Sequence, residues 1–175
     1  MSLVLIAEPD LEPKDRDWIE TYRAAHDPHL SIVSPHFTLI FPGNNSEEAL
    51  LAHIKEAIEG FAPIHFVLRS ALVAKDASSP LTYVFLVPDE GFGQIVRLHD
   101  RLYTGLLEKS LRLDIPYIPH IGMGAFESPS DAKRLADEIN AAPLAIAGTL
   151  NDLSLAAFDG ETLTPRARLT LQPQR

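Results

Sequence analysis

The sequence predicts an α+β protein with two pseudo-symmetric β-α-β-α-β lobes, whose antiparallel or mixed sheets flank a central cleft. Three observations support this prediction. Runs of alternating apolar residues, typical of strands, are interleaved with runs at helical spacing. The order of these runs is the same before and after a polar loop at residues 75–80. A short pattern of proline, histidine, apolar, small and apolar residues occurs once in each half.

The first half contains three expected strands and two expected helices. The strands are expected at 2–8, 32–41 and 64–74. The first helix, over residues 14–25, carries its apolar residues on one face. The second begins after Ser46, whose hydroxyl would cap the first turn, and is expected to end at Gly60. These elements make up a first lobe of about residues 1–76.

The second half repeats that order and then continues. Its strands are expected at 82–87, 117–126, 144–149, 153–158 and 166–171. A long amphipathic helix is expected over residues 91–110, and a second helix begins with the capping sequence Ser128-Pro129-Ser130-Asp131. The second lobe would span about residues 81–175, and the two lobes would form one domain over residues 1–175.

The composition restricts the class of protein. The chain has 175 residues, of which 46% are hydrophobic, enough for one packed core. No apolar run approaches the roughly 18 residues of a membrane span, and no basic segment precedes an apolar stretch at the N-terminus. We therefore expect a monomeric cytoplasmic protein without a membrane partner. Because cysteine is absent, disulfides, thiol nucleophiles and iron–sulfur clusters are excluded.

The charge disfavours one class of partner. The chain has 15 Lys and Arg against 24 Asp and Glu, a formal net charge of −9. Such a field repels long nucleic acid, so we expect no binding to a long polynucleotide. A small phosphorylated ligand would have to be held by local donors.

The two similar segments are Pro35-His36-Phe37-Thr38-Leu39 and Pro119-His120-Ile121-Gly122-Met123. Residues two apart in a strand share a face, so each histidine should point the same way as the small residue after it. The two histidines are 84 residues apart. The same offset relates Ser46 to Ser130 and Leu51 to Leu135, which indicates an internal duplication. Lobes related by a pseudo-twofold axis would bring both histidines into one cleft.

Two facing histidines can carry out acid–base chemistry. Imidazole has an ordinary pKa near 6.5, so one ring can be neutral while the other is protonated. Such a pair can take a proton from water and give one to a leaving oxygen, which hydrolysis of a cyclic phosphodiester requires. A threonine hydroxyl on the same face could donate to a phosphoryl oxygen. Neither a metal nor another cofactor is needed.

These segments, within duplicated halves, resemble the two-histidine phosphoesterase superfamily, which includes the bacterial 2′-5′ RNA ligase and related cyclic phosphodiesterases. The resemblance covers nearly the whole chain and implies a hydrolase of RNA processing. It implies that His36 and His120 are the catalytic acid and base, in an order left open, and that Thr38 binds phosphate. The substrate would be a small cyclic nucleotide or the 2′,3′-cyclic phosphate of an RNA 3′ end, with hydrolysis favoured over ligation by the acidic charge.

Gly122 departs from that family pattern, which has threonine or serine at this position. Losing one donor of this kind costs about 10²- to 10³-fold in rate. An alternative function is therefore a module that binds a phosphorylated ligand or nucleotide through a degraded catalytic site. Backbone at Gly122 could still approach the ligand, and Tyr117, just before the second motif, is a further candidate for substrate binding. Packing between the lobes is the alternative for Tyr117.

Other polar residues have weaker patterns. We expect His99, on an apolar helix face, to be a core residue, and His53 and His65 to be structural or on the surface. The proline between His26 and His29 prevents the ligand spacing of a helical metal site. Further candidates for stacking on a base or for neutralising a phosphate are Tyr83, Arg69, Arg101 and Arg112.

Overall fold

The computed structural model describes residues 1–75 and 79–173. Its helices are α1 (Pro13–His26), α2 (Glu47–Ala57), α3 (Phe92–Leu102) and α4 (Pro129–Asn140), with a 3₁₀ helix, η1, at Gly105–Ser110. Its strands are β1 (Ser2–Ala7), β2 (Asp10–Leu11), β3 (Phe37–Gly43), β4 (Ile64–Lys75), β5 (Thr82–Glu90), β6 (Ile121–Phe126), β7 (Ile146–Leu150), β8 (Asp152–Phe158) and β9 (Leu163–Thr170). In the described part of the chain, no helix is long and apolar enough to cross a membrane.

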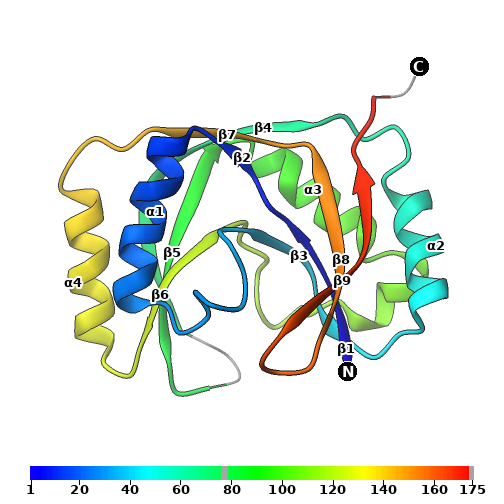
Figure 1. Cartoon of the computed structure of the whole chain (residues 1–175), viewed down its shortest axis with the longest axis horizontal. Helices are drawn as coiled ribbons and strands as arrows, with labels where there is room; N and C mark the ends of the chain where they lie inside the picture. The colour runs from blue at the N-terminus through cyan, green and yellow to red at the C-terminus, as the bar shows by residue number, and fades with distance from the viewer. Residues whose placement is uncertain (76–78, 174–175) are drawn as a thin grey trace.

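The strands form two sheets, and the α+β prediction is confirmed. One sheet has the order β3-β1-β8-β9 and the other β2-β7-β4-β5-β6. Every pairing between the described strands is antiparallel. In Figure 1, β5 and β6 stand at the left and β8 and β9 at the right, while β4 and β7 run across the top.

The two sheets are not the two sequence halves that we expected as lobes. The β4 strand belongs to the first half but pairs with β5, and β8 belongs to the second half but pairs with β1. The first half thus places β1 and β3 in one sheet and β4 in the other. The second half places β5, β6 and β7 in the sheet of β4, and β8 and β9 in the sheet of β1. Local connection explains this exchange, because β4 ends at Lys75 and β5 begins at Thr82, and strands so close in sequence pair readily as an antiparallel hairpin.

The duplication is visible in the strand register. Leu5, Ile6 and Ala7 pair with Ile40, Thr38 and Phe37. In the second copy, Val84, Phe85 and Leu86 pair with Gly124, Gly122 and Ile121. Both ladders change register at the same place, after Leu5 and after Val84. A shared irregularity of this kind places Thr38 and Gly122 at equivalent positions of two equivalent strand pairs.

The third strands of the two copies meet at the centre of the molecule. Within the β4–β7 ladder, Phe66 lies opposite Gly148, and the flanking pairs extend equally in both directions. A Cβ atom on Gly148 would lie 2.5 Å from Cζ of Phe66, so this position has room only for glycine. The pseudo-twofold axis therefore passes between these two residues, which are 82 positions apart.

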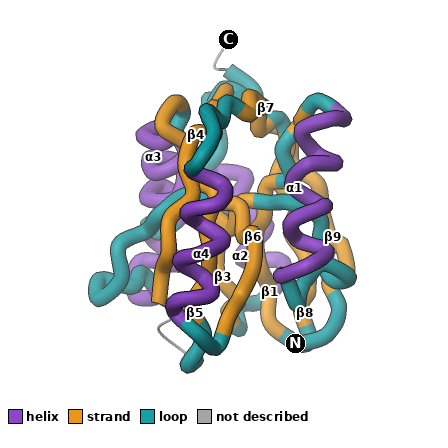
Figure 2. The backbone as a smooth tube through the Cα atoms, turned by 90° about the vertical axis from the view of Figure 1, so that its left-hand side faces the viewer, coloured by secondary structure: helices purple, strands orange, loops and turns teal. Residues whose placement is uncertain are grey.

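The helices are exchanged in the same way. Helices α1 and α4 cover the five-stranded sheet, where α1 packs on β6 and α4 on β4 and β5. Figure 2, seen from that side, shows both helices in front of these strands. Helices α2 and α3 contact each other on the opposite side, where α3 packs on β3. Each first helix therefore packs against the motif strand of the other copy.

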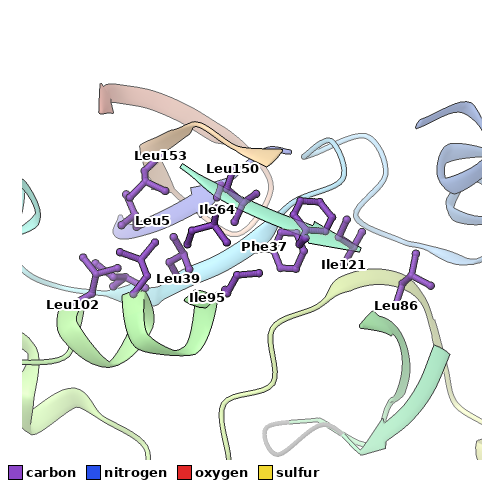
Figure 3. Packing of buried hydrophobic residues seen from close by; sticks show 14 of the residues in the cluster. Leu5, Phe37, Leu39, Ile64, Leu86, Ile95, Leu102, Ile121, Leu150 and Leu153 are labelled. Atoms are coloured by element: carbon purple, nitrogen blue, oxygen red, sulfur yellow. The ribbon is translucent and has the colours of Figure 1, made fainter. Parts of the chain in front are cut away.

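One continuous core joins both sheets to the helices. It includes Phe37 and Ile121, the residues that follow the two motif histidines, both 0% exposed. Burial of each such side chain contributes about 1.5–3 kcal/mol to folding. Figure 3 shows further members of this cluster from β1, β3, β4, β5, α3, β7 and β8: Leu5, Leu39, Ile64, Leu86, Ile95, Leu102, Leu150 and Leu153.

Several predicted boundaries were wrong. The helix expected over residues 91–110 ends at Leu102, and η1 begins at Gly105, whose φ of 49° interrupts α-helical geometry. The strand expected from residue 32 begins at Phe37, because residues 27–33 form turns whose amides bond to Asp27 and His29 carbonyls. The expected strand at 117–126 likewise begins at Ile121, and the short β2 was not predicted.

The match between Ser46 and Ser130 also needs correction. The residue that caps α4 is Ser128, which accepts from the amide of Asp131, whereas Ser46 caps α2 by accepting from Ala49. The offset therefore falls from 84 residues in the motif strands to 82 in the following helices, because the second connection is two residues shorter. With the corrected offset, Leu50, Ile54 and Ala57 match Ala132, Ala136 and Ile139, and all six are buried.

Candidate active site

The two motif histidines lie at equivalent places, each directly before an edge strand of its sheet. His36 precedes β3, and His120 precedes β6. Both side chains are partly exposed, whereas the next residues point into the core. The alternation expected from the sequence therefore holds at this point, because an inward apolar residue turns its neighbour outward.

Both imidazoles are oriented by the same hydrogen bond. Nδ1 of His36 lies 2.8 Å from the carbonyl oxygen of Ser34, and Nδ1 of His120 lies 2.6 Å from that of Ile118. A carbonyl only accepts, so each Nδ1 must carry the proton. Nε2 of each neutral ring is therefore the atom left to accept a proton. Each motif supplies its own orienting group two residues before the histidine.

The two histidines also affect each other electrostatically. Burial lowers the pKa of His120 to about 4, against the hydrogen bond to Ile118, and the charge of His36 lowers it further. The two motifs are also joined by a direct contact, because the hydroxyl of Tyr117, three residues before His120, donates to the carbonyl oxygen of Thr38, two residues after His36.

His36 has a more polar environment. Burial again lowers its pKa, while the bond to Ser34 opposes the shift; the charge of Arg23 lowers the pKa, and those of Asp27 and Glu8 raise it. These two carboxylates favour the protonated ring. The first histidine thus lies among charged groups from α1, the loop after it and the end of β1.

The second histidine has an aromatic neighbour instead. The rings of Phe85 and His120 stack with centroids 3.5 Å apart and planes at 16°. The ring of Tyr83 also stacks on the ring of Phe85, with centroids 5.9 Å apart. Phe85 lies opposite Gly122 in the β5–β6 ladder and occupies the place that Ile6 has in the first copy. Sequence reasoning missed Phe85; the alternation of β5 alone could have placed it on the same face as Tyr83.

The two small residues of the motifs differ in what surrounds them. Thr38 is partly exposed, and its hydroxyl-bearing side chain lies two residues after His36 in the sequence. Gly122 is also partly exposed, and a Cβ atom added to it would meet no atom within 4 Å. Packing therefore does not require glycine at position 122, and a serine or threonine side chain would fit there.

Tyr117 links the two motifs. Its hydroxyl donates to the carbonyl oxygen of Thr38 at 2.9 Å, and its ring stacks on His99 with centroids 3.7 Å apart. Burial raises the pKa of this phenol, which keeps it a donor. Both interactions lie within the protein and favour the packing alternative over contact with a substrate. His99 is 3% exposed, as expected for a core residue.

The other candidates lie in local interactions. Arg69 pairs with Asp89 and Glu90, Arg112 pairs with Asp114, and Arg101 donates to the carbonyl of Glu59. His53 bonds to the carbonyl of Leu102, and the exposed His65 lies 3.5 Å from the Thr149 hydroxyl. No group of three or more metal-ligating side chains converges within residues 1–75 and 79–173.

Two surface hollows lie away from the histidine pair. One of about 570 Å³ is formed by the end of α1 and the ends of β5 and β6, and one of about 310 Å³ lies beside β2 and β7. Neither is lined by His36, His120, Thr38 or Gly122.

Comparison with known proteins gives the family. A model of the 2′-5′ RNA ligase superfamily matches residues 9–162. The chain belongs to that superfamily. A Bacillus licheniformis protein named as a candidate phosphoesterase is 26% identical over 112 residues, which are 62% of this chain and 62% of that protein. The chain thus matches less than two thirds of the length of this curated relative.

Solved structures show the same fold. The protein TT0787 of Thermus thermophilus has a TM-score of 0.64 and 19% identity, with all of both chains covered. The apo form of Escherichia coli LigT has a TM-score of 0.58 and 21% identity, with 99% of this chain and 98% of LigT covered. Another LigT structure contains 3′-AMP; its TM-score is 0.57 at 18% identity, and 97% of each chain is covered. The resemblance that the motifs predicted is confirmed.

Proposed function

We propose that this protein is a phosphoesterase that hydrolyses a cyclic phosphodiester by paired histidine acid–base catalysis. One observation carries the proposal: a hydrogen bond from Tyr117 to Thr38 joins the segments that carry His120 and His36, and each histidine has its Nδ1 bound to a backbone carbonyl. Two Nε2 atoms are then available at one site, one to accept a proton and one to donate it. The relative named as a candidate phosphoesterase supports this class of reaction.

The reaction balances without any further group. Water attacks phosphorus, and the basic Nε2 takes its proton. The bond from phosphorus to one ribose oxygen breaks, and the acidic Nε2–H protonates that oxygen. The product is a phosphate monoester with a free hydroxyl. Proton exchange with solvent then returns both rings to their starting states. Each proton transfer accelerates the step by about 10²- to 10⁴-fold.

The surroundings of the rings suggest which histidine is the base. His120, stacked on Phe85 and with its pKa lowered to about 4, is neutral near pH 7 and suited to accept a proton. Burial lowers the pKa of His36 as well, but Asp27 and Glu8 oppose that shift, whereas no carboxylate among the described residues acts on His120 in the same way. An anionic substrate raises the pKa of both rings, and the two carboxylates then favour protonation of His36 first. We therefore assign His120 as base and His36 as acid.

The remaining motif residues would bind the phosphate. The Thr38 hydroxyl is the donor expected on the His36 side. The Gly122 side offers backbone and open space in place of a second hydroxyl. A site with one hydroxyl donor would work more slowly than one with two, and the alternative of a phosphorylated-ligand-binding module rests on this difference.

The substrate class follows from charge and from the neighbours. The net charge of −9 disfavours a long polynucleotide and favours a small cyclic nucleotide or a short RNA with a 2′,3′-cyclic end. LigT, which has the same fold, has been crystallised with 3′-AMP. We therefore propose 2′,3′-cyclic nucleoside monophosphates as the first substrates to test.

The experiment is to follow purified protein with 2′,3′-cyclic AMP by ³¹P NMR, which separates the cyclic phosphate from the 2′ and 3′ monoesters. We expect turnover by the unmodified chain and loss of turnover in His36→Ala and His120→Ala. The exposed His65→Ala is the matched control and should turn over normally. Equal rates in all four proteins would refute the proposal. Binding of the product without turnover would instead support the binding module.

A second substrate tests the assignment of roles. A phosphodiester with a p-nitrophenyl leaving group needs no general acid, because the departing phenolate is stable near neutral pH. His36→Ala should retain most of its activity on this ester, whereas His120→Ala should not. The reverse result would exchange the two roles.

A further inference from the structure

Arg23 is a charged residue in an unusual place. It lies near the end of α1 and is 2% exposed, although arginine is almost never fully buried unless it is paired. Helix α1 packs on β6, the strand that follows His120. At this contact, a Cβ atom on Gly124 would lie 2.7 Å from Cβ of His26, so helix and strand are in close contact. Arg23 therefore belongs to a helix that is packed closely on the strand that follows His120.

The guanidinium group of Arg23 reaches to the first motif. Its Nε donates to Asp27 at 2.8 Å, and one terminal nitrogen donates to the carbonyl oxygen of Val33 at 2.8 Å. The other terminal nitrogen lies 3.4 Å from Glu20. The residue after Val33 is Ser34, whose carbonyl accepts the Nδ1 proton of His36. One buried cation thus holds the backbone directly beside the group that orients the catalytic imidazole.

The carboxylate of Asp27 extends this connection. Its second oxygen accepts from the backbone amide of His29, at 2.9 Å, inside the turn that leads to the motif. The carbonyl of His29 in turn accepts from the amides of Ile32 and Val33. The loop between α1 and β3 is therefore bonded at its beginning and at its end to the same guanidinium group. Planar forked donors suit this task because they fix direction as well as distance.

The second copy shows that the fold does not need a charge at this position. The residues that precede α1 and α3 as N-caps, Glu12 and Gly91, are 79 positions apart. At the same offset, Arg23 corresponds to Leu102, which is 0% exposed. An ordinary leucine therefore fills the equivalent place at the end of α3. The charge in the first copy has to be explained by what it bonds, which is the loop before His36.

We propose that Arg23 is a positioning residue that sets the orientation of the His36 imidazole relative to His120. The proposal rests on the function proposed above for the histidine pair. Because α1 is packed on β6, a bond from α1 to the loop before His36 transmits the position of the second motif strand to the first histidine. Without the bond, the carbonyl of Ser34 would lose its defined place, and Nδ1 of His36 its fixed acceptor.

Charge adds to this effect. The groups that act on the titration of His36 are Arg23 on α1, Asp27 in the following loop and Glu8 after β1, and the ring of His120 is coupled to His36. Arg23 opposes protonation of His36 directly, and it also neutralises Asp27, which favours protonation. Removal of the guanidinium group should therefore raise the pKa of His36.

The test uses the full-length protein with Arg23→Met, which keeps an unbranched buried stem, and with Arg23→Lys, which keeps the charge but cannot fork to both Asp27 and Val33. Arg16→Met is the control, because Arg16 lies on the same helix and donates to the carbonyl of Pro9. Histidine ¹⁵N NMR reports the tautomer and pKa of each imidazole without any substrate. Steady-state kinetics with 2′,3′-cyclic AMP report kcat and KM separately.

We expect Arg23→Met to lower kcat about 10²-fold with little change in KM, the cost of a small misplacement of a catalytic group. Its His36 should lose the pure Nδ1–H tautomer and titrate at higher pH, while the tautomer of His120 is unchanged. For Arg23→Lys, both kcat and the His36 tautomer should be intermediate between those of the unmodified protein and those of Arg23→Met. Unchanged kcat and an unchanged His36 tautomer in Arg23→Met overturn the proposal. Equal spectral changes at both histidines also overturn it, because they indicate a general loss of structure.

Two outcomes keep the proposals separate. If the unmodified protein hydrolyses no cyclic phosphate, the proposed function fails, and the NMR comparison still decides whether Arg23 orients His36. If Arg23→Met does not fold, Arg23→Lys is the test variant. A His36 tautomer and a kcat equal to those of the unmodified protein would overturn the role of the forked contact. A change confined to His36 would support it.

Discussion

The two halves of this protein place the same histidine motif in different surroundings. In the first copy His36 lies among Arg23, Asp27 and Glu8, and in the second copy His120 stacks on Phe85. The strand pairs that carry the motifs share one register shift, after Leu5 in the first and after Val84 in the second. Duplication thus supplies two equivalent backbones, and the surrounding side chains make the two imidazoles chemically unequal. Groups whose surroundings separate their pKa values can serve as acid and base at one pH.

The largest effect should come from removing either histidine. His36→Ala and His120→Ala should each lower kcat about 10²- to 10⁴-fold on 2′,3′-cyclic AMP. The two variants should differ in their pH profiles of kcat/KM, because each removes one of the two ionisations. His120→Ala should lose the limb that falls toward low pH, and His36→Ala the limb that falls toward high pH. Identical profiles for the two variants would contradict the assignment of unequal roles.

The next effect concerns the hydroxyl that only the first copy has. Thr38→Val removes the donor while keeping the branched shape, and kcat should fall about 10²- to 10³-fold. Gly122→Ser should have the opposite effect and raise kcat, because a side chain at this position meets open space. Gly122→Ala is the matched control, since it adds a Cβ atom without a donor. If serine and alanine at position 122 give equal rates, the second motif does not need a hydroxyl.

A smaller effect should follow from the aromatic neighbour of the second copy. Phe85→Ala exposes the His120 ring to water, which removes part of the burial that lowers its pKa to about 4. The pKa should rise toward the ordinary value near 6.5. Because the base must be neutral, activity should then begin to fall at a higher pH as the solution is acidified. The pH profile of kcat/KM and the NMR titration of His120 measure this shift; Phe92→Ala, an exposed residue on α3, is the control.

The smallest effect concerns stability rather than rate. Gly124→Ala would place Cβ against His26, where helix α1 packs on the strand of the second motif. Overpacking of this kind costs about 1–3 kcal/mol, or roughly 2–4 °C in Tm per kcal/mol for a chain of this size. Gly122→Ala, two residues earlier in the same strand, should leave Tm unchanged. Equal Tm values for the two variants would show that α1 can move away from β6 at little cost.

Much of the candidate site was predictable from local pattern. His36, Thr38, His120 and Gly122 were identified because alternation in a strand depends only on neighbouring residues. The α+β class and eight of the nine described strands followed from periodicity, although several ends were wrong. Helix ends depend on single residues such as Gly105, whose positive φ separates η1 from α3. The two-residue β2 is too short to have a period at all.

The partners of these residues were not predictable in the same way. Phe85 contacts His120 across a strand pair, Arg23 reaches Val33 through a turn, and Tyr117 donates to Thr38 over 79 positions. Each contact depends on how strands are registered and helices packed, which alternation within one segment does not encode. The exchange of β4 and β8 between the sheets is a further example, because either half could have closed on itself with the same hydrophobic pattern.

The sequence by itself determined that there are two motifs, that each turns a histidine away from the core, and that one lacks a hydroxyl. Those properties are local, because they follow from residue type and from a period of two. Only the tertiary structure decided that Tyr117, beside the second motif, bonds to Thr38 of the first, and that one histidine lies among charged groups and the other against a phenyl ring. Burial and the proximity of charged groups depend on the tertiary structure. They shift the pKa values of the two histidines by different causes, although the two motifs are alike.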